Sequence, residues 1–305
     1  MSLFAMAALT LADGSVIDLD GHPSQGTRHR VLRGRLRETG ERVIVKVELV
    51  SGALEVERLA LVWVGDHGVR VPRLITESEC PLMDAPARCL VIEAITGEAP
   101  ETTEEWNLLG RGLASLAAVP VAGSPLRIEA HDAFLAAHEA RIRDLGRPAL
   151  EALGGAQARQ LPTSAPVSGC NPLVVTHGDP GPGNFLVTAA GGVLLDWEEA
   201  HVAPRGLDLA RSVFIALAGV GPEGYAGREH AERARAVAAG YLAAVDWRPD
   251  AAELRWWLTV AGIQFAHRRW ERRGQARVLP WQDALTVLRS ALLSDEWMPD
   301  AAGRG

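Results

Sequence analysis

The feature that most constrains the fold is a short strand-rich segment inside the helical second half of the chain. It runs LVVTHGDPGPGNFLVTAAGGVLLDWEEA, over residues 173–200. Its apolar runs at residues 173–175 and 193–195 are as short as buried strands usually are. Glycine and proline supply the tight turns between them. We therefore expect strands here, with the loops between them on rigid supports.

The rest of the chain shows two kinds of sequence pattern, one typical of strands and one typical of helices. Together they predict an α+β fold of two lobes. Residues 15–93 read as strands, with a hairpin turn at residues 38–40 and one helix, residues 53–68, that ends at Gly68. A further strand containing a proline is expected near residues 69–75. From Thr103, the expected N-cap, long helices are predicted over residues 103–119, 131–145 and about 207–293. Residues 154–169 read as a linker.

These patterns predict a strand-rich N-lobe in residues 1–93 and a mainly helical C-lobe in residues 94–305. In the strand around residues 43–47, the two-residue period puts Val43, Val45 and Val47 on one face. Ile44 and Lys46 then share the other face.

Charge and composition exclude several classes of protein. The net charge of −7 argues against a nucleic-acid partner, because that requires concentrated lysine and arginine. No run approaches the roughly 18 apolar residues that a membrane helix needs, so we expect a cytoplasmic protein without a membrane partner. Three cysteines, Cys80, Cys89 and Cys170, lack metal-ligand spacing and are interpreted as idle thiols.

The polar residues of the 173–200 segment are the types that phosphoryl transfer requires. Such chemistry needs a carboxylate that orients the attacking hydroxyl and oxygen ligands for Mg²⁺ beside the phosphates. Asp179 and Asn184 lie on one loop, and Asp196 closes the next apolar strand. Asp179 is the candidate catalytic base, and Asn184 and Asp196 are the candidate metal ligands.

The same residues carry a family resemblance. THGDPGPGN followed by VLLDWEEA resembles the HGDxxxxN and DWE signatures of the aminoglycoside phosphotransferase and choline kinase superfamily. The resemblance extends from about Gly26 to Leu209. It implies a bilobal protein-kinase-like fold, ATP or GTP and Mg²⁺ as cofactors, and a small-molecule hydroxyl as acceptor.

The resemblance also assigns residues of the N-lobe. Lys46 takes the place of the phosphate-binding lysine, and Ile44 would cover the adenine. Glu57 would pair with Lys46. A helical wheel agrees, because Glu57 lies among apolar residues whereas Glu55 lies beside Arg58. A carboxylate on the apolar side needs such a cation.

The nucleotide-binding positions outside that pair rest on the resemblance alone. The segment LVIEAITGEA resembles the family hinge, whose backbone at Glu93 and Ala94 would bond to the base. The phosphate loop is placed in GHPSQGTRHRVLRG, without a clear glycine pattern. Ser24, Gly26 and Thr27 are assigned there by position only.

Several other residues have a structural interpretation. We expect His177 to support the loop and Asp208 to accept hydrogen bonds from the loop backbone. Glu198 and Glu199 could assist the metal or the acceptor, or be solvated. The basic run at residues 267–274 is interpreted as a solvated helix face, and most tryptophans as core.

The predicted function is phosphate transfer to an aminoglycoside-like or other amine-bearing acceptor, a choice that the acidic net charge favours slightly. A metabolite kinase acting on choline, ethanolamine, homoserine or a sugar is the alternative. A nucleotide-binding pseudokinase is a further one. The sequence leaves open whether the chain is a monomer or a homodimer.

Overall fold

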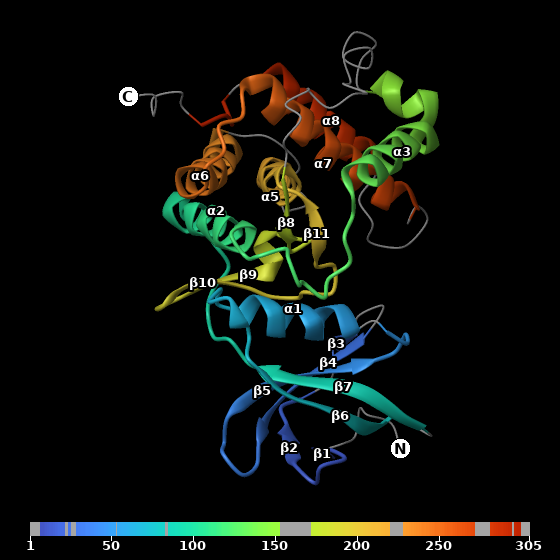
Figure 1. Cartoon of the computed structure of the whole chain (residues 1–305), viewed down its shortest axis with the longest axis vertical. Coiled ribbons are helices and arrows are strands. Elements are labelled where there is room, and N and C mark those ends of the chain that lie inside the picture. Colours follow the sequence, from blue (N-terminus) through green and yellow to red (C-terminus); the bar gives the residue numbers. More distant parts are fainter. Residues whose placement is uncertain are drawn as a thin grey trace.

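The computed structural model describes residues 7–21, 24–25, 29–52, 54–82, 85–152, 172–219, 228–271, 281–294 and 296–299. They form a strand-rich lobe and a helical lobe (Figure 1), which confirms the expected α+β division. The first lobe contains β1 (Ala8–Thr10), β2 (Val16–Leu19), β3 (Ser24–Gln25), β4 (His29–Leu36), β5 (Arg42–Glu48), α1 (Glu55–Asp66), β6 (Leu74–Leu82) and β7 (Ala85–Glu93). The second contains α2 (Thr103–Ala117), α3 (His131–Ala152), β8 (Leu173–Thr176), β9 (Phe185–Thr188), β10 (Gly191–Leu194), β11 (His201–Pro204), α5 (Gly206–Ala218), α6 (Arg228–Ala244), α7 (Ala251–Glu271) and α8 (Trp281–Leu293).

The seven strands of the first lobe form one antiparallel sheet. Its order is β1-β2-β4-β5-β7-β6, with β3 paired to β4. The predicted alternation in β5 is confirmed, since Val43, Val45 and Val47 are fully buried in the core on one face. Ile44 packs on the other side, in the core that is shared with α1 and the helical lobe. Figure 1 shows α1 between the sheet and the helical lobe.

The helical lobe is built around a closely packed pair of helices, α2 and α6. Glycine allows this approach on both sides. A Cβ at Gly110 would lie 2.1 Å from the carbonyl oxygen of Val237, and one at Gly240 would lie 2.2 Å from that of Asn107. Helix α5 runs through the centre of the lobe and is buried along most of its length.

The strands expected in the 173–200 segment are present as β8, β9 and β10, and they form two small antiparallel sheets together with β11, which follows the segment and was not expected. β8 pairs with β11, and β9 pairs with β10. Both sheets pack against α2, so the loops between the strands are held close to the junction of the two lobes.

Four expectations need correction or lie outside the described residues. The N-cap of α2 is Thr102, not Thr103, because Thr102 and Glu105 form a capping box. The strand expected near residues 69–75 begins only at Leu74, after the proline at 72. The linker at residues 154–169 lies outside the described residues, as does the loop at 26–27.

Cys80 and Cys89 are free and buried, as expected for idle thiols, and Cys170 lies outside the described part of the chain. Among the helices that the structure describes, none joins the length and the apolar character needed to cross a bilayer.

The contact between α2 and α6 gives a stability prediction with a control on the same helix. Gly110→Ala should lower the free energy of unfolding by about 2 kcal/mol, because its methyl group would overlap the backbone of α6. Gly112→Ala should be neutral or stabilising by up to about 1 kcal/mol, since the nearest atom to its Cβ lies 3.8 Å away. Urea denaturation of both variants measures the difference, and equal effects would contradict it.

Candidate active site

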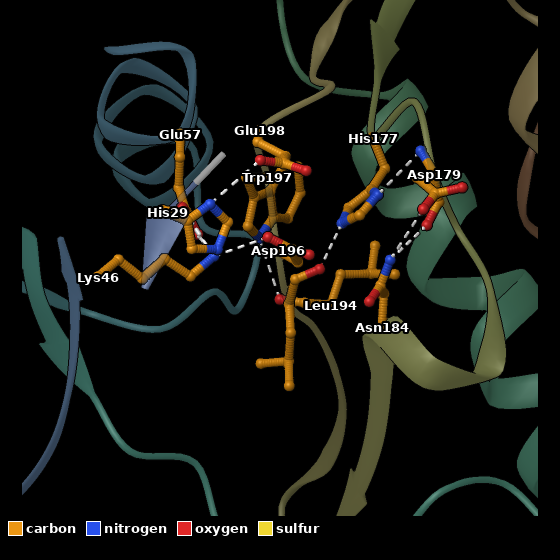
Figure 2. A network of polar contacts seen from close by, with 11 residues as sticks. His29, Lys46, Glu57, His177, Asp179, Asn184, Leu194, Asp196, Trp197 and Glu198 are labelled. Atoms are coloured by element: carbon orange, nitrogen blue, oxygen red, sulfur yellow. Dashed lines mark hydrogen bonds and ion pairs between the residues drawn. The ribbon is translucent and has the colours of Figure 1, made fainter. Parts of the chain in front are cut away.

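A buried lysine at the lobe junction carries the site. Lys46 Nζ lies 2.7 Å and 2.8 Å from the two carboxylate oxygens of Glu57 and 2.7 Å from Asp196 Oδ1 (Figure 2). Glu57 is fully buried on α1, and Lys46 is 6% exposed on β5. The predicted partner was therefore the correct glutamate, because Glu55 pairs with Arg58 and Arg88 at the surface.

The electrostatics of this cluster keep the lysine charged. Burial works against its positive charge, but the carboxylates of Glu57 and Asp196 outweigh that effect, and the pKa of Lys46 lies above its usual value. Burial likewise opposes the charge of Asp196, and Lys46 overcomes it, so the pKa of Asp196 is lowered. The three groups form an ion cluster that joins the sheet, α1 and the helical lobe.

Asp196 owes its position to an unusual backbone conformation. Its φ of 63° lies in the left-handed region, which non-glycine residues rarely adopt. The next residue anchors this turn, since Trp197 is fully buried and its Nε1 donates to the Leu194 carbonyl at 3.0 Å. The turn directs the Asp196 carboxylate toward Lys46 (Figure 2). Such strain at a polar side chain is typical of functional sites.

The loop after β8 brings the other two candidates together. Asn184 Nδ2 donates to the main-chain carbonyl of Asp179 at 3.0 Å and to its Oδ2 at 3.3 Å. The Asp179 side chain stays 46% exposed, open to a substrate. Asn184 also accepts, through its main-chain carbonyl, a bond from the Leu195 N–H at 2.8 Å, which ties the loop to the strand that leads into Asp196.

His177 and Asp208 hold this loop, and their expected structural roles are confirmed. Asp208, on α5, accepts bonds from the N–H groups of His177 at 2.6 Å and Gly178 at 3.1 Å. The Asp179 N–H donates to Nδ1 of His177, so Nε2 carries the ring proton and donates to the Leu195 carbonyl. Burial lowers the pKa of His177, which keeps the ring neutral and unsuited to moving protons.

A cavity of about 740 Å³ lies between the lobes, of a size that suits a nucleotide. Ile44 and Ile92 line it from the sheet, and Leu186 and Leu195 line it from the helical lobe. Its polar residues include Lys46, Asn184 and Asp196. The predicted base-covering residue, Ile44, and the predicted phosphate and metal residues therefore face one space.

The hinge residues Glu93 and Ala94 also line the cavity. Their backbone N–H groups, however, are already used in hydrogen bonds within the fold. The N–H of Glu93 donates to the Arg73 carbonyl, and the N–H of Ala94 donates to the Arg42 carbonyl. Any bond from these two residues to a base would therefore use their carbonyl oxygens. Among the loop positions, Ser24 is part of β3, while Gly26 and Thr27 lie outside the described residues.

Two residues near the site, His29 and Arg268, were given no role there by sequence reasoning. His29, at the start of β4, lies 3.3 Å from Glu198, and both are close to Asp196 (Figure 2). Arg268 Nη1, on α7, lies 3.6 Å from Asp179 Oδ1. The basic run was interpreted as a solvated face, which is wrong for the buried His267. Arg268 is partly exposed, at 41%, but its guanidinium lies beside Asp179. Helical spacing alone did not show that this face of α7 turns toward the catalytic loop.

The buried pair gives a stability prediction with a matched control. Glu57→Gln should lower the free energy of unfolding by about 3 kcal/mol, because it leaves a buried lysine short of a counterion. Glu55→Gln, on the same helix but with partly exposed partners, should cost less than about 1 kcal/mol. Chemical denaturation of the two variants tests this, and equal losses would show that burial of the pair is unimportant.

Comparison with known proteins agrees with this geometry. The model of the phosphotransferase enzyme family (APH) matches residues 29–257. The amicoumacin kinase hAmiN, solved with AMP-PNP and Ca²⁺, has a TM-score of 0.60 at 13% identity, over 90% of this chain and 87% of that one. A type I macrolide 2′-phosphotransferase gives 0.60 at 16%, over 90% and 92%.

A choline kinase from Cryptosporidium parvum gives a TM-score of 0.56 at 13% identity, over 91% of this chain and 88% of that one. A search of curated protein sequences finds no match. These structural similarities confirm the expected protein-kinase-like fold. Because the family model covers three quarters of the sequence, with Lys46, Asp179, Asn184 and Asp196 inside it, this chain belongs to the phosphotransferase enzyme family.

Proposed function

We propose that the protein transfers the γ-phosphate of ATP or GTP, with Mg²⁺, to a hydroxyl of a small molecule. One observation supports this above all. A single inter-lobe cavity is lined by a paired lysine, an amide and a carboxylate, and the exposed Asp179 lies on the same loop as the amide. Family membership and the fold support the same reaction class.

The cavity has an apolar end that suits a nucleobase. Ile44 and Ile92 face it from one lobe and Leu186 and Leu195 from the other, so a planar ring would be enclosed on both faces. The hinge carbonyls would accept from the exocyclic amine of the base, and the N–H of Ile95, which also lines the cavity, would donate to a ring nitrogen.

The opposite end suits phosphates and a divalent cation. Asn184 uses its Nδ2 within the loop, which leaves its side-chain oxygen for a cation. Asp196 gives only Oδ1 to Lys46, so Oδ2 remains for a ligand. Carboxylate and amide oxygens are the donors that Mg²⁺ prefers. The cation would neutralise charge on the transferring phosphate, and Lys46 would bind the α- and β-phosphates.

Asp179 would orient the acceptor hydroxyl and receive its proton. Its half-exposed carboxylate can meet a substrate, while Asn184, His177 and Asp208 hold the backbone around it. Phosphoryl transfer passes through a loose transition state, so positioning and charge neutralisation matter more than base strength. The rigidity of this loop is consistent with that requirement.

Asp179→Ala should lower acceptor-dependent turnover by at least about 100-fold while nucleotide binding persists. A coupled nucleotide-consumption assay measures turnover across aminoglycosides, amino alcohols, hydroxy acids and sugars, and so also identifies an antibiotic or metabolite kinase. Asp66→Ala, at an exposed position on α1, is the control. Substantial activity in the Asp179 variant would refute its role as base.

Asp196→Asn should remove the Mg²⁺ dependence of ATP binding, because it takes away the anionic ligand of the cation. Thermal unfolding with ATP, with and without Mg²⁺, measures this effect, and the wild type should be stabilised far more with Mg²⁺ present. A wild-type protein that shows this response but no turnover with any acceptor would instead be a nucleotide-binding pseudokinase.

A further inference from the structure

Arginines gather near the loop that holds Asp179 in the part of the chain that the structure describes. Three helices contribute one arginine each, Arg141 from α3, Arg211 from α5 and Arg268 from α7. We propose, on the basis of the phosphotransferase function above, that the acceptor carries an anionic group, a carboxylate or a phosphate, and that Arg268 selects it.

Arg268 is the arginine that an acceptor would meet first. Its side chain is 41% exposed, and its Nη1 lies 3.6 Å from Asp179 Oδ1. That separation is longer than a hydrogen bond, so the guanidinium is attracted to Asp179 but not bonded to it. Its planar fork of donors is therefore available to a carboxylate or phosphate oxygen pair.

Arg211 supplies positive charge from behind the loop without a carboxylate hydrogen-bond partner. Its Nη1 donates to the Gly178 carbonyl, and its Nε and Nη2 donate to Gln264 Oε1 at 3.1 Å and 2.9 Å. Both acceptors are neutral. Burial, together with the charges of Arg268 and Arg141, lowers the pKa of Arg211 to about 10, although Asp208 and Asp179 act in the opposite direction. The three guanidinium groups therefore repel one another.

Arg141 adds an unsatisfied donor. Its Nη1 is buried with no hydrogen-bond partner among the described residues, a costly arrangement for a charged group. Burial lowers its pKa, and Arg268 contributes to that shift. An incoming anion could accept a hydrogen bond from this donor and offset the positive charge of the three arginines.

The acidic groups nearby have other partners as well as the arginines, since Asp208 and Asp179 also act on Arg211. Asp208 accepts from two loop N–H groups, Glu129 lies 3.4 Å from His201, and Glu271 lies 3.5 Å from His267. Glu129 and Glu271 do act on Arg141 and raise its pKa, but less than burial lowers it. An ammonium group placed beside Arg268 would be repelled, while an anion would relieve the repulsion among the arginines.

The geometry also limits the size of the acceptor. A hydroxyl bonded to Asp179 lies about 2.7 Å from its carboxylate, and an anion on Arg268 lies about 2.8 Å from the guanidinium. Because Arg268 is 3.6 Å from that carboxylate, the two groups would be separated by only a few bonds. Short hydroxy acids or hydroxyalkyl phosphates fit this spacing.

A series built on one three-carbon skeleton tests the charge preference. D-glycerate and sn-glycerol 3-phosphate are the anionic members, glycerol is neutral and 3-amino-1,2-propanediol is cationic. ATP consumption is measured with each, and thermal unfolding is measured with each in the presence of saturating Mg²⁺ and ADP. The anionic members should raise the melting temperature and the turnover more than the other two, and comparing them distinguishes carboxylate from phosphate.

Arg268→Gln should lower the ratio of kcat/KM for the preferred anionic member to kcat/KM for glycerol by about 10- to 100-fold. Arg268→Glu should reverse the order of the anionic and cationic members. Arg289→Gln, at an exposed position on α8, is the matched control and should change neither.

Three outcomes would overturn the inference: equal or better binding and turnover of the cationic member, an anion preference unchanged in Arg268→Gln, or no anion-dependent response. The nucleotide function is tested separately, because Mg²⁺ and ATP should stabilise the wild type and not Lys46→Met. Failure of that response would refute the proposed function, whereas failure of the series alone would refute only the acceptor class.

Discussion

The buried ion pair between Lys46 and Glu57 is the interaction on which the site depends. Neither charge can be buried alone, because removing a lone ion from water costs several kcal/mol. Their pairing therefore requires α1 to lie against β5 at one register. Asp196 extends the pair to the helical lobe, so the same three charges position the two lobes that line the cavity.

The loop that holds Asp179 depends on a second set of buried bonds. Asp208 accepts from two consecutive N–H groups, and the neutral ring of His177 spans from the Asp179 N–H to the Leu195 carbonyl. These bonds leave the side chain of Asp179 with contacts only to Asn184 and Arg268 among the described residues. The Asp179 carboxylate is therefore available to bind a substrate.

The net charge of the whole chain and the side chains near Asp179 suggest different kinds of acceptor. The chain as a whole is acidic, at −7, and this favoured an amine-bearing acceptor. Near the loop that holds Asp179, however, three helices contribute one arginine each, and field strength at a binding site depends on the nearest charges. The local arrangement therefore outweighs the net charge as a guide to the acceptor.

The sequence by itself determined the strand and helix textures, the loop that holds Asp179 and Asn184, the partnership of Lys46 with Glu57, and the support from Asp208. The strands and helices follow from local period and the loop from motif spacing, whereas the two pairings came chiefly from the resemblance to a known family. The tertiary structure decided what spacing cannot express: the use of the Glu93 and Ala94 amides within the fold, the approach of His29 to Glu198, and the turn of Arg268 toward Asp179. These contacts join segments far apart in the chain, so they depend on how helices pack and not on the order of residues along any one of them.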